Sequence, residues 1–333
     1  MKLNLKEQKR WLITGVAGFI GTNLLIKLLE NNQKVIGIDN FITGKKSNLN
    51  KVKKIVGSKN WKNFKFYKGD ICNLKDCKKA VKDVNYILHH AALGSVPKSM
   101  KEPELNNNIN VNGFLNILLA AKESNVNRII YASSSAVYGD GIELPKKENS
   151  EIKPLSPYAL SKVINEQYAR LFSEIFEMDI VGLRYFNVYG PFQDENGDYA
   201  AVIPKWIENF KNSKPVVIYG DGKSTRDFCH VSEIVNANIL AAQVKKNISG
   251  EVFNVANGKK INLDQLFKLI KNSFEETEIK LDQEKPKYDN YRDGDIKDSF
   301  ASINKIKKTI NFNPSTSLKI GMKNTVAWFI SRE

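Results

Sequence analysis

The most informative stretch of the chain is Trp11-Leu12-Ile13-Thr14-Gly15-Val16-Ala17-Gly18-Phe19-Ile20-Gly21, where an apolar strand passes through a glycine-rich turn into a helix. Apolar residues at helical spacing predict that this helix covers residues 19–30. Gly15 permits the tight turn, Gly18 lets backbone amides approach a pyrophosphate, and Gly21 lets helix and strand pack closely. Glycines at this spacing occur in many ordinary turns. Their position between a strand and a helix predicts a dinucleotide-binding unit.

Asp39 closes the next predicted strand, 24 residues after Gly15. A carboxylate at this place accepts hydrogen bonds from a ribose 2′-hydroxyl and repels a 2′-phosphate. The sequence therefore favours NAD over NADP as cofactor. The alternative for Asp39 is a solvated turn residue before Asn40.

Strands and helices alternate through the first half of the chain. Further strands are expected at residues 35–38, 64–67, 84–89, 128–132 and 180–184, and further helices at residues 111–122 and 157–176. Such alternation requires crossover connections. The predicted fold class is therefore α/β, with a Rossmann-type doubly wound parallel sheet.

Beyond Tyr185 the loops become longer and richer in Gly, Asp and Asn, and a strand-like run returns near residues 251–257. We expect an NAD-binding domain made of residues 1–184 plus about 227–257. Residues 185–226 and 258–333 are expected to form a smaller, partly interleaved α/β domain that binds the substrate.

The 333 residues carry 51 Lys plus Arg against 36 Asp plus Glu, a net charge of +15, and 42% are apolar. Only seven of the cations are Arg, the residue on which base recognition depends most, so no nucleic-acid partner is expected. No apolar run approaches the roughly 18–20 residues that cross a bilayer, and no secretory signal is recognisable. We expect a cytoplasmic protein with no membrane partner.

Three cysteines and three histidines complete the inventory of reactive side chains. An odd number of cysteines in a chain of this length does not indicate a disulfide framework. The histidines show no spacing suited to zinc, so no metal site is expected.

A second group of residues suggests acid–base chemistry: Tyr158 and Lys162, with the triplet Ser133, Ser134 and Ser135 upstream. Residues at i and i+4 share one face of a helix. Bringing a Tyr pKa from about 10 to about 7 takes roughly 4 kcal/mol, which a nearby ammonium and a positively charged nicotinamide can supply. The alternative for Tyr158 and Lys162 is a surface helix pair.

With these motifs in view, the chain resembles the extended short-chain dehydrogenase/reductase superfamily, and within it the UDP-sugar 4-epimerases, most closely the UDP-N-acetylglucosamine 4-epimerase group. The resemblance runs from Trp11 to about Trp328. It is carried by the segments His89-His90-Ala91-Ala92-Leu93-Gly94-Ser95-Val96-Pro97, Arg184-Tyr185-Phe186-Asn187-Val188-Tyr189-Gly190, and Gln193-Asp194 leading into Tyr199-Ala200-Ala201-Val202-Ile203-Pro204.

The resemblance implies a role for each residue that matches a family motif. Ser134 matches the catalytic hydroxyl, Tyr158 the base and Lys162 its partner. The expected cofactor-binding residues are Gly15, Gly18, Phe19, Ile20, Gly21, Asp39, Asn40, Asp70, Ile71, Ala91, Ala92, Asn110, Tyr158 and Lys162, with Asp70 and Ile71 against adenine. The expected substrate-binding residues are Gly94, Ser133, Ser134, Ser135, Asn187, Ala201, Val202, Tyr219, Arg226, Arg292 and Ser299, with Asn187 and the two arginines on the diphosphate. A homodimer is also implied.

The reaction follows from what is missing beside the serines. Enzymes of this resemblance oxidise the sugar at C4 by hydride transfer to NAD. A 4,6-dehydratase would carry an Asp-Glu pair after the catalytic hydroxyl, and a decarboxylase a Glu; this chain has Ser135-Ala136. We expect the 4-keto sugar to turn over and take the hydride back on its opposite face, which is C4 epimerisation.

The choice of sugar is argued from volume. Ser299 stands where glucose-type enzymes carry a bulky Tyr, and Gly94 where they carry a Lys. Small residues leave room for a 2-acetamido group, so UDP-GlcNAc/UDP-GalNAc is the expected pair, with UDP-Glc/UDP-Gal also accepted. Ala136 departs from the hydroxyl residue of the acetamido-preferring group. UDP-hexuronates, a net nucleotide-sugar oxidoreductase and a catalytically silent NAD-binding scaffold remain alternatives.

Overall fold

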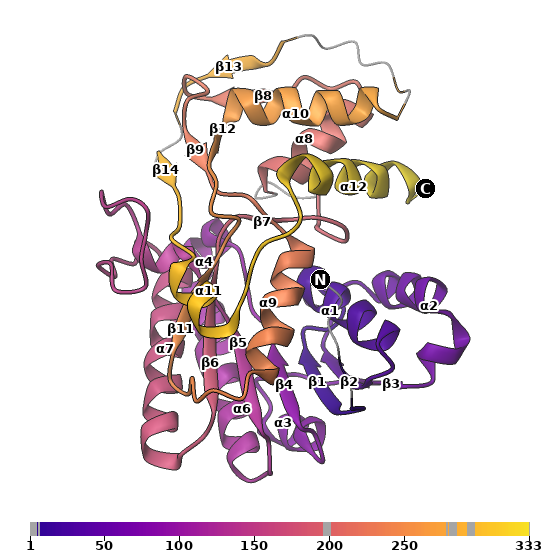
Figure 1. The fold of residues 1–333 in the computed structure, drawn as a ribbon, viewed down its shortest axis with the longest axis vertical. Coiled ribbons are helices and arrows are strands. Elements are labelled where there is room, and N and C mark those ends of the chain that lie inside the picture. Colours follow the sequence, from indigo (N-terminus) through magenta and orange to yellow (C-terminus); the bar gives the residue numbers. More distant parts are fainter. Residues whose placement is uncertain are drawn as a thin grey trace.

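Seven parallel strands form the central sheet of the protein (Figure 1). The structure is a computed structural model that describes residue 5 and residues 7–195, 201–277, 279, 285–291 and 297–332. The sheet contains β1 (Arg10–Thr14), β2 (Lys34–Asp39), β3 (Phe64–Lys68), β4 (Tyr86–His89), β5 (Arg128–Ser134), β6 (Ile180–Tyr185) and β11 (Val252–Val255). Their order is β11-β6-β5-β4-β1-β2-β3, and every neighbouring pair is parallel.

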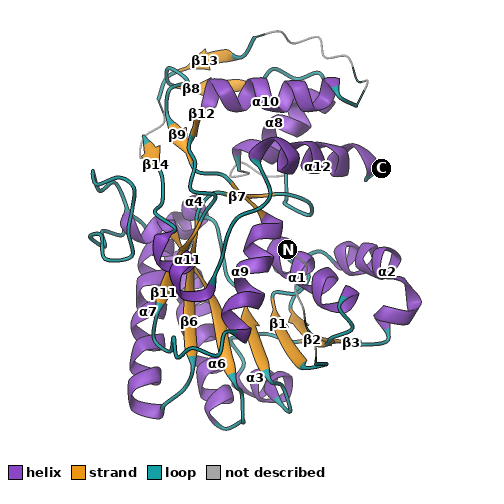
Figure 2. Cartoon of the chain, in the orientation of Figure 1, coloured by secondary structure: helices purple, strands orange, loops and turns teal. Residues whose placement is uncertain are grey.

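Helices cover both faces of this sheet (Figure 2). One face packs against α1 (Phe19–Glu30), α2 (Lys46–Trp61), α9 (Val231–Gln243) and α11 (Asn304–Ile310). The other packs against α3 (Leu74–Val81), α6 (Gly113–Lys122) and α7 (Pro157–Phe176), with the short helices α4 (Val96–Lys101) and α5 (Pro103–Asn107) beside α7. Trp11 and Ile13 belong to the first core and Leu12 to the second, so β1 is buried on both faces. The predicted doubly wound fold is confirmed.

A smaller unit lies beyond the carboxyl ends of the strands, at the top of Figure 1. It contains α8 (Val202–Lys211), α10 (Leu263–Glu275) and α12 (Leu318–Ser331) around an aromatic core, together with the paired strands β8 (Val217–Tyr219) and β13 (Lys287–Asp289). A three-stranded sheet of β12 (Ile261–Asn262), β9 (Thr225–Arg226) and β14 (Asp298–Ser299) adjoins it, and β7 (Val188–Tyr189) pairs with β10 (Cys229–His230).

The chain passes between the large sheet and the smaller unit several times. After β12 and α10 it returns to the sheet, where Ile306 and Ile310 of α11 join the core beside β11. Residues 304–310 therefore lie against the large sheet, whereas the expected division assigned them to the smaller domain. The division into two domains stays a prediction. Among the described residues, none of the helices has the length and apolarity needed to cross a membrane.

The glycine turn brings β1 and α1 into close contact. Gly15 has a φ of +68°, a conformation that favours glycine. A Cβ at Gly15 would lie 2.8 Å from the backbone nitrogen of Ala91, and a Cβ at Gly21 would overlap the carbonyl oxygen of Gly15. Because both obstacles are backbone atoms, neither can move aside cheaply, and the turn admits only glycine at these two positions.

Replacing Gly21 by Ala should destabilise the protein by about 1–3 kcal/mol, the usual cost of overpacking, and should reduce its NAD content. Gly141→Ala is the control, since that Cβ would come closest to Nζ of Lys146, the end of a flexible side chain that can shift. Urea unfolding and NAD released on denaturation measure both effects. If the two variants behave alike, close backbone approach at Gly21 does not explain its glycine.

Candidate active site

The strand order reverses between β1 and β4, and open α/β sheets bind ligands at the carboxyl ends of the strands beside such a point. The turn after β1 presents Gly15, Gly18, Phe19, Ile20 and Gly21 to a cleft of about 970 Å³, and Ala92 lines the same cleft after β4. The turn fits a dinucleotide, because Gly15 and Gly21 let the backbone of β1 and α1 pack closely and the helix then begins at the cleft, where its backbone amides can bind a pyrophosphate.

Asp39 is not a solvated turn residue, since only 8% of it is exposed. Its Oδ2 accepts from the backbone nitrogen of Ala17 at 2.9 Å and its Oδ1 from that of Phe41 at 2.8 Å. Burial raises the pKa of Asp39, and these two N–H groups counteract part of that rise. Each carboxylate oxygen keeps a second lone pair for a ribose hydroxyl.

Most of the remaining predicted cofactor residues line a second cavity, and Asp70 contacts one of the residues in its wall. Asp39, Asn40, Ile71, Ala91 and Ala92 line a second cavity beside Gly15 and Gly18. Asp70 supports this wall from behind, because its Oδ2 accepts from Asn40 Nδ2 at 3.0 Å.

Asn110 lies in the interior, 1% exposed, and lines neither cavity. Its side chain accepts from the nitrogen of Leu93 at 2.7 Å and donates to the carbonyl of Leu93 at 3.2 Å and to Ser161 Oγ at 3.1 Å. Asn110 therefore shapes the segment after β4 from below, and its predicted place beside the nicotinamide stays a prediction.

The structure brings Ser134, Tyr158 and Lys162 together in the cleft. Ser134 ends β5, while Tyr158 and Lys162 lie one turn apart on α7, which Ser156 caps by accepting from the nitrogen of Ala159. Lys162 Nζ is 5.7 Å from the centroid of the Tyr158 ring and donates to the carbonyl of Ala132 at 2.9 Å. The surface-pair alternative fails for Lys162, which is 3% exposed.

Burial acts on the titration of both groups. It raises the pKa of Tyr158, and a hydrogen bond from Ser134 lowers it in part. Burial lowers the pKa of Lys162 to about 8, and the negative charge of Glu166 opposes that fall. Lys162 thus stays mostly protonated at neutral pH, as a partner of a developing tyrosinate must.

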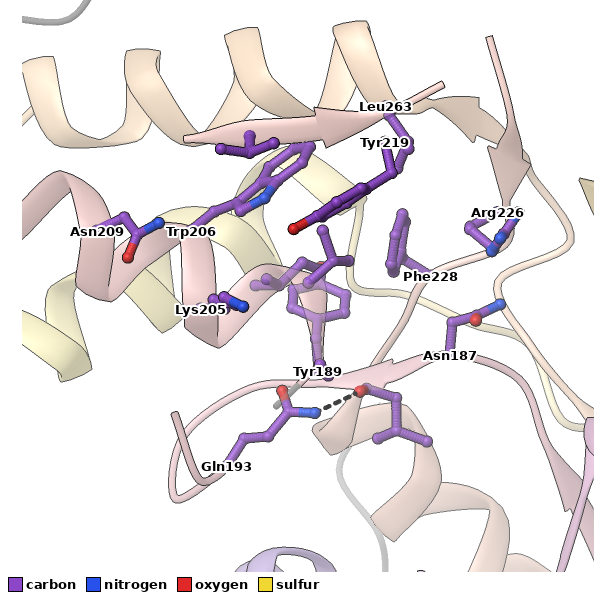
Figure 3. A pocket seen from close by; sticks show the side chains of 15 residues that line it. Asn187, Tyr189, Gln193, Lys205, Trp206, Asn209, Tyr219, Arg226, Phe228 and Leu263 are labelled. Atoms are coloured by element: carbon purple, nitrogen blue, oxygen red, sulfur yellow. Dashed lines mark hydrogen bonds between the residues drawn. The ribbon is translucent and has the colours of Figure 1, made fainter. Parts of the chain in front are cut away.

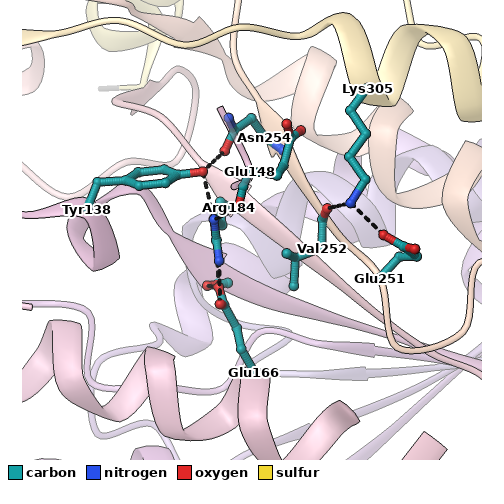
Figure 4. A network of polar contacts seen from close by, with 9 residues as sticks. Tyr138, Glu148, Glu166, Arg184, Glu251, Val252, Asn254 and Lys305 are labelled. Atoms are coloured by element: carbon teal, nitrogen blue, oxygen red, sulfur yellow. Dashed lines mark hydrogen bonds and ion pairs between the residues drawn. The ribbon is translucent and has the colours of Figure 1, made fainter. Parts of the chain in front are cut away.

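Beneath these residues lies a buried polar network (Figure 4). Glu166 accepts from Arg184 Nη2 at 2.7 Å and Nε at 2.8 Å, and from Ser133 Oγ at 2.6 Å. Arg184 Nη1 donates to the Tyr138 hydroxyl at 2.7 Å, which donates to Asn254 at 2.6 Å. Ser133 is therefore engaged in the network, and it also lines the cleft together with Ser134 and Ser135.

A further cavity of about 390 Å³ opens from the cleft toward the smaller unit (Figure 3). Five of the predicted substrate residues line it: Asn187, Ala201, Val202, Tyr219 and Arg226. Arg226 Nη1 donates to the carbonyls of Thr225 at 2.9 Å and Lys297 at 3.0 Å, which fixes the guanidinium at the rim.

Ser299 lies beside this wall, opposite Arg226 in the parallel β14–β9 pair. Its Oγ accepts from Asn187 Nδ2 at 3.3 Å. Gly94 lines the large cleft, and a Cβ built there would meet nothing within 4 Å. Arg292 lies outside the described residues.

Sequence reasoning did not assign Trp206, Lys205 and Phe228, which also line the 390 Å³ cavity. Trp206 and Lys205 follow directly on the Ala201–Pro204 segment, and Phe228 follows Arg226 by two residues, so proximity to assigned residues was the available signal. Among the described residues, no three His, Cys, Asp or Glu side chains are grouped as metal ligands would be.

Comparison with known proteins shows which family this chain resembles in sequence and in structure. The model of the NAD dependent epimerase/dehydratase family matches residues 11–256. A putative UDP-glucose 4-epimerase from Methanocaldococcus jannaschii is 37% identical over 95% of this chain and 97% of its own, and a UDP-glucuronate 4-epimerase from Thermodesulfobacterium geofontis is 33% identical over 96% and 95%. The solved UDP-N-acetylglucosamine 4-epimerase from Methanobrevibacter ruminantium M1, in complex with UDP-N-acetylmuramic acid, superposes with a TM-score of 0.89 and 41% identity over 98% of this chain and 100% of that one.

A doubly wound sheet with a glycine turn and a Tyr-Lys pair in its cleft defines a nicotinamide-dependent enzyme of the extended short-chain dehydrogenase/reductase class. Within that class, the chain belongs to the NAD dependent epimerase/dehydratase family, and NAD is its cofactor.

Replacing Tyr158 by Phe should leave NAD bound and reduce turnover of a nucleotide sugar by about 10²–10⁴-fold, the usual contribution of a positioned acid–base group. Tyr168→Phe, on the same helix and outside the cleft, should retain activity. Steady-state rates and NAD content are measured for both. A Tyr158→Phe protein with wild-type rates would exclude Tyr158 as the base.

Replacing Lys162 by Met should stabilise the protein at pH 7 and remove activity. The folded pKa of Lys162 is about 8 against 10.5 unfolded, so between these values the unfolded chain binds more protons and wild-type stability rises with pH. The advantage of the variant should shrink by about 2 kcal/mol between pH 7 and pH 9.5. Denaturant unfolding at both pH values measures it, with exposed Lys268→Met as control. An advantage that is independent of pH would contradict the burial cost assigned to Lys162.

Proposed function

We propose that this protein is a UDP-sugar 4-epimerase that interconverts UDP-GlcNAc and UDP-GalNAc. The observation that carries the proposal is the small Ser299 side chain, which lines neither cavity itself but accepts a hydrogen bond from Asn187, a residue that lines both the 390 Å³ cavity and the catalytic cleft. Relatives named for UDP-N-acetylglucosamine, UDP-glucose and UDP-glucuronate epimerisation support the reaction class.

The catalytic steps follow from the positions of three side chains. Tyr158 takes the proton of the sugar 4-hydroxyl, since its phenol lies in the cleft and accepts a hydrogen bond from Ser134. Lys162 stabilises the tyrosinate through its charge, and its hydrogen bond to Ala132 keeps the ammonium in place. Bound NAD supplies the hydride acceptor and donor at C4. Tyr158 then returns the proton to the epimeric oxygen.

The nucleotide would occupy the cavity of Figure 3. Asn187 and Arg226 lie at its rim and would contact the diphosphate, for which a guanidinium gives charge-assisted hydrogen bonds. Val202 begins α8 and Ala201 is its N-cap residue, and both line the cavity together with Tyr219. Arg292 would complete the diphosphate clamp.

The alternatives differ in what they require at C2 and C6. UDP-Glc and UDP-Gal fit wherever an acetamido sugar fits. A UDP-hexuronate would need a partner for its carboxylate. It stays an alternative substrate because one relative is named as a UDP-glucuronate 4-epimerase. A net oxidoreductase would consume nicotinamide, whereas an epimerase turns over with the cofactor it retains.

We also propose a homodimer formed through α7. Phe172 on that helix is buried in the core, whereas Leu171 and Ile175 are 48% and 64% exposed. The apolar residues of α7 therefore divide between the chain's own core and an exposed face that a second copy would cover. A cytoplasmic location stays a prediction.

Replacing Ser299 by Tyr should reduce kcat/KM for UDP-GlcNAc by at least about tenfold, because the larger side chain takes the acetamido space, while UDP-Glc turnover persists. Ser299→Ala is the matched control and should keep the wild-type preference. Both variants are assayed with UDP-GlcNAc, UDP-Glc and UDP-GlcNAcA, and the sugars are then resolved. A Ser299→Tyr enzyme that epimerises UDP-GlcNAc at the wild-type rate would refute the volume argument.

A further inference from the structure

Asp227 is a fully buried carboxylate between β9 and β10, with 0% of the residue exposed. Its Oδ1 accepts from the nitrogen of Asn257 at 3.0 Å and its Oδ2 from the nitrogen of Gly258 at 3.1 Å. The backbone N–H groups of Lys259 and Ala301 also lower the pKa of this carboxyl. Four N–H groups from two other segments of the chain thus act on one side chain.

The backbone of Asp227 holds the residues at the substrate wall. Its nitrogen donates to the carbonyl of Ser299 at 2.8 Å, and its carbonyl accepts from Asn187 Nδ2 at 3.1 Å. Arg226 precedes Asp227 directly and pairs with Ser299 in the parallel β14–β9 ladder. Asp227 is therefore linked directly to all three residues: by a peptide bond to Arg226, and by a backbone hydrogen bond each to Asn187 and Ser299.

Three connections between the large sheet and the smaller unit meet at this carboxylate. They run from β9 to α9, from β11 to β12, and from β14 to α11. Three strands from which these connections start or to which they lead, β9, β12 and β14, pair in one sheet between the large sheet and α10 (Figure 1). Asp227 lies on the first and accepts from the second through Asn257 and Gly258. Its backbone nitrogen donates to Ser299 at the start of the third, and the N–H group of Ala301 on the third lowers the pKa of its carboxyl.

The carboxylate is retained at a cost to stability. Burial raises the pKa of Asp227 to about 7, and the only opposing influences are the backbone N–H groups. The folded state therefore binds more protons than the unfolded state between about pH 4 and pH 7, and stability falls as the pH rises through that range. A group that destabilises the protein at neutral pH is a candidate for a role in function.

Among the residues that the structure describes, no side-chain charge shifts the pKa of this carboxyl. The titratable groups on the elements packed around it are Arg226 and Cys229 on its own segment, Lys259 on the second connection, Asp298 on β14, and Lys146, which forms a β-bridge with Ala301.

We propose that Asp227 is a positioning residue that sets the affinity of the enzyme for its UDP-sugar by holding Asn187, Arg226 and Ser299 in one arrangement across the three connections. The inference rests on the proposed function, because it takes these three residues to contact the substrate. Protonation places an O–H donor among four N–H groups, so the arrangement loosens in acid and the UDP-sugar binds more weakly.

Asp227→Asn tests the proposal, since the amide keeps the shape and loses the charge. We expect KM for UDP-GlcNAc to rise at least about tenfold, as for loss of one charge-assisted hydrogen bond, with kcat falling less and NAD content unchanged. Asp179→Asn is the control: it weakens a pair with Arg128 at the opposite end of β5 and should leave KM unchanged. An Asp227→Asn enzyme with wild-type KM, or one that loses kcat and NAD together, would overturn the proposal.

The wild-type protein gives a second test that does not depend on how the variant folds. UDP-GlcNAc carries no group that titrates between pH 6 and pH 8. Its dissociation constant, measured by calorimetry, should rise about fivefold from pH 8 to pH 6. A constant independent of pH would overturn the inference and leave the proposed function intact. Binding with the expected pH dependence but without epimerisation would instead reject the proposed function.

Discussion

The buried ion pair between Glu166 and Arg184 is the interaction on which the catalytic end of the sheet depends. The two side chains are 8% and 4% exposed, so removing either partner would leave an uncompensated buried charge, at a cost of about 3–5 kcal/mol. Glu166 lies on α7 and Arg184 on β6, and the same carboxylate accepts from Ser133 at the end of β5. One pair thus joins the catalytic helix to two central strands.

The pair also determines the electrostatics of the site above it. Lys162 lies one turn before Glu166 on α7, and the negative charge of Glu166 counteracts the burial that lowers the pKa of Lys162. Arg184 neutralises most of that carboxylate, so Lys162 receives partial support and its pKa stays close enough to neutral for the charge to respond to the cofactor and to Tyr158. The site therefore combines a buried carboxylate that Arg184 neutralises with a Lys162 ammonium whose charge is only partly neutralised.

Much of the architecture could be predicted because it depends on signals within short segments of sequence, such as apolar spacing and the residues at helix ends. The helices α1 and α7 begin and end where apolar spacing, Gly18 and Ser156 place them. By contrast, α2 was not predicted: its Lys- and Asn-rich sequence carries only a few buried apolar residues, such as Leu49, Val52 and Val56, and Gly57 interrupts it with a φ of +74°. Its helical structure depends on packing against α1, which no local pattern reveals.

The candidate site was also predictable in part. Ser134, Tyr158 and Lys162 lie close to one another because a strand end and a helix start meet at the edge of a parallel sheet. What sequence spacing could not reveal is which polar groups are already engaged. Ser133 is bound to Glu166 and Asn110 to Leu93, and both facts depend on partners 33 and 17 residues away.

Substrate selectivity and substrate affinity share one anchor in this structure. The volume available to the sugar depends on where Ser299 lies, and Ser299 lies where the β14–β9 pair and the Asp227 nitrogen hold it. Asn187, which would contact the diphosphate, is hydrogen-bonded to both Asp227 and Ser299. A change that shifts β14 to enlarge the sugar space therefore also displaces the diphosphate contacts. The chain can exchange the side chain at position 299 far more readily than it can move that strand, so substrate choice within this fold is expected to vary through single side chains on a fixed backbone.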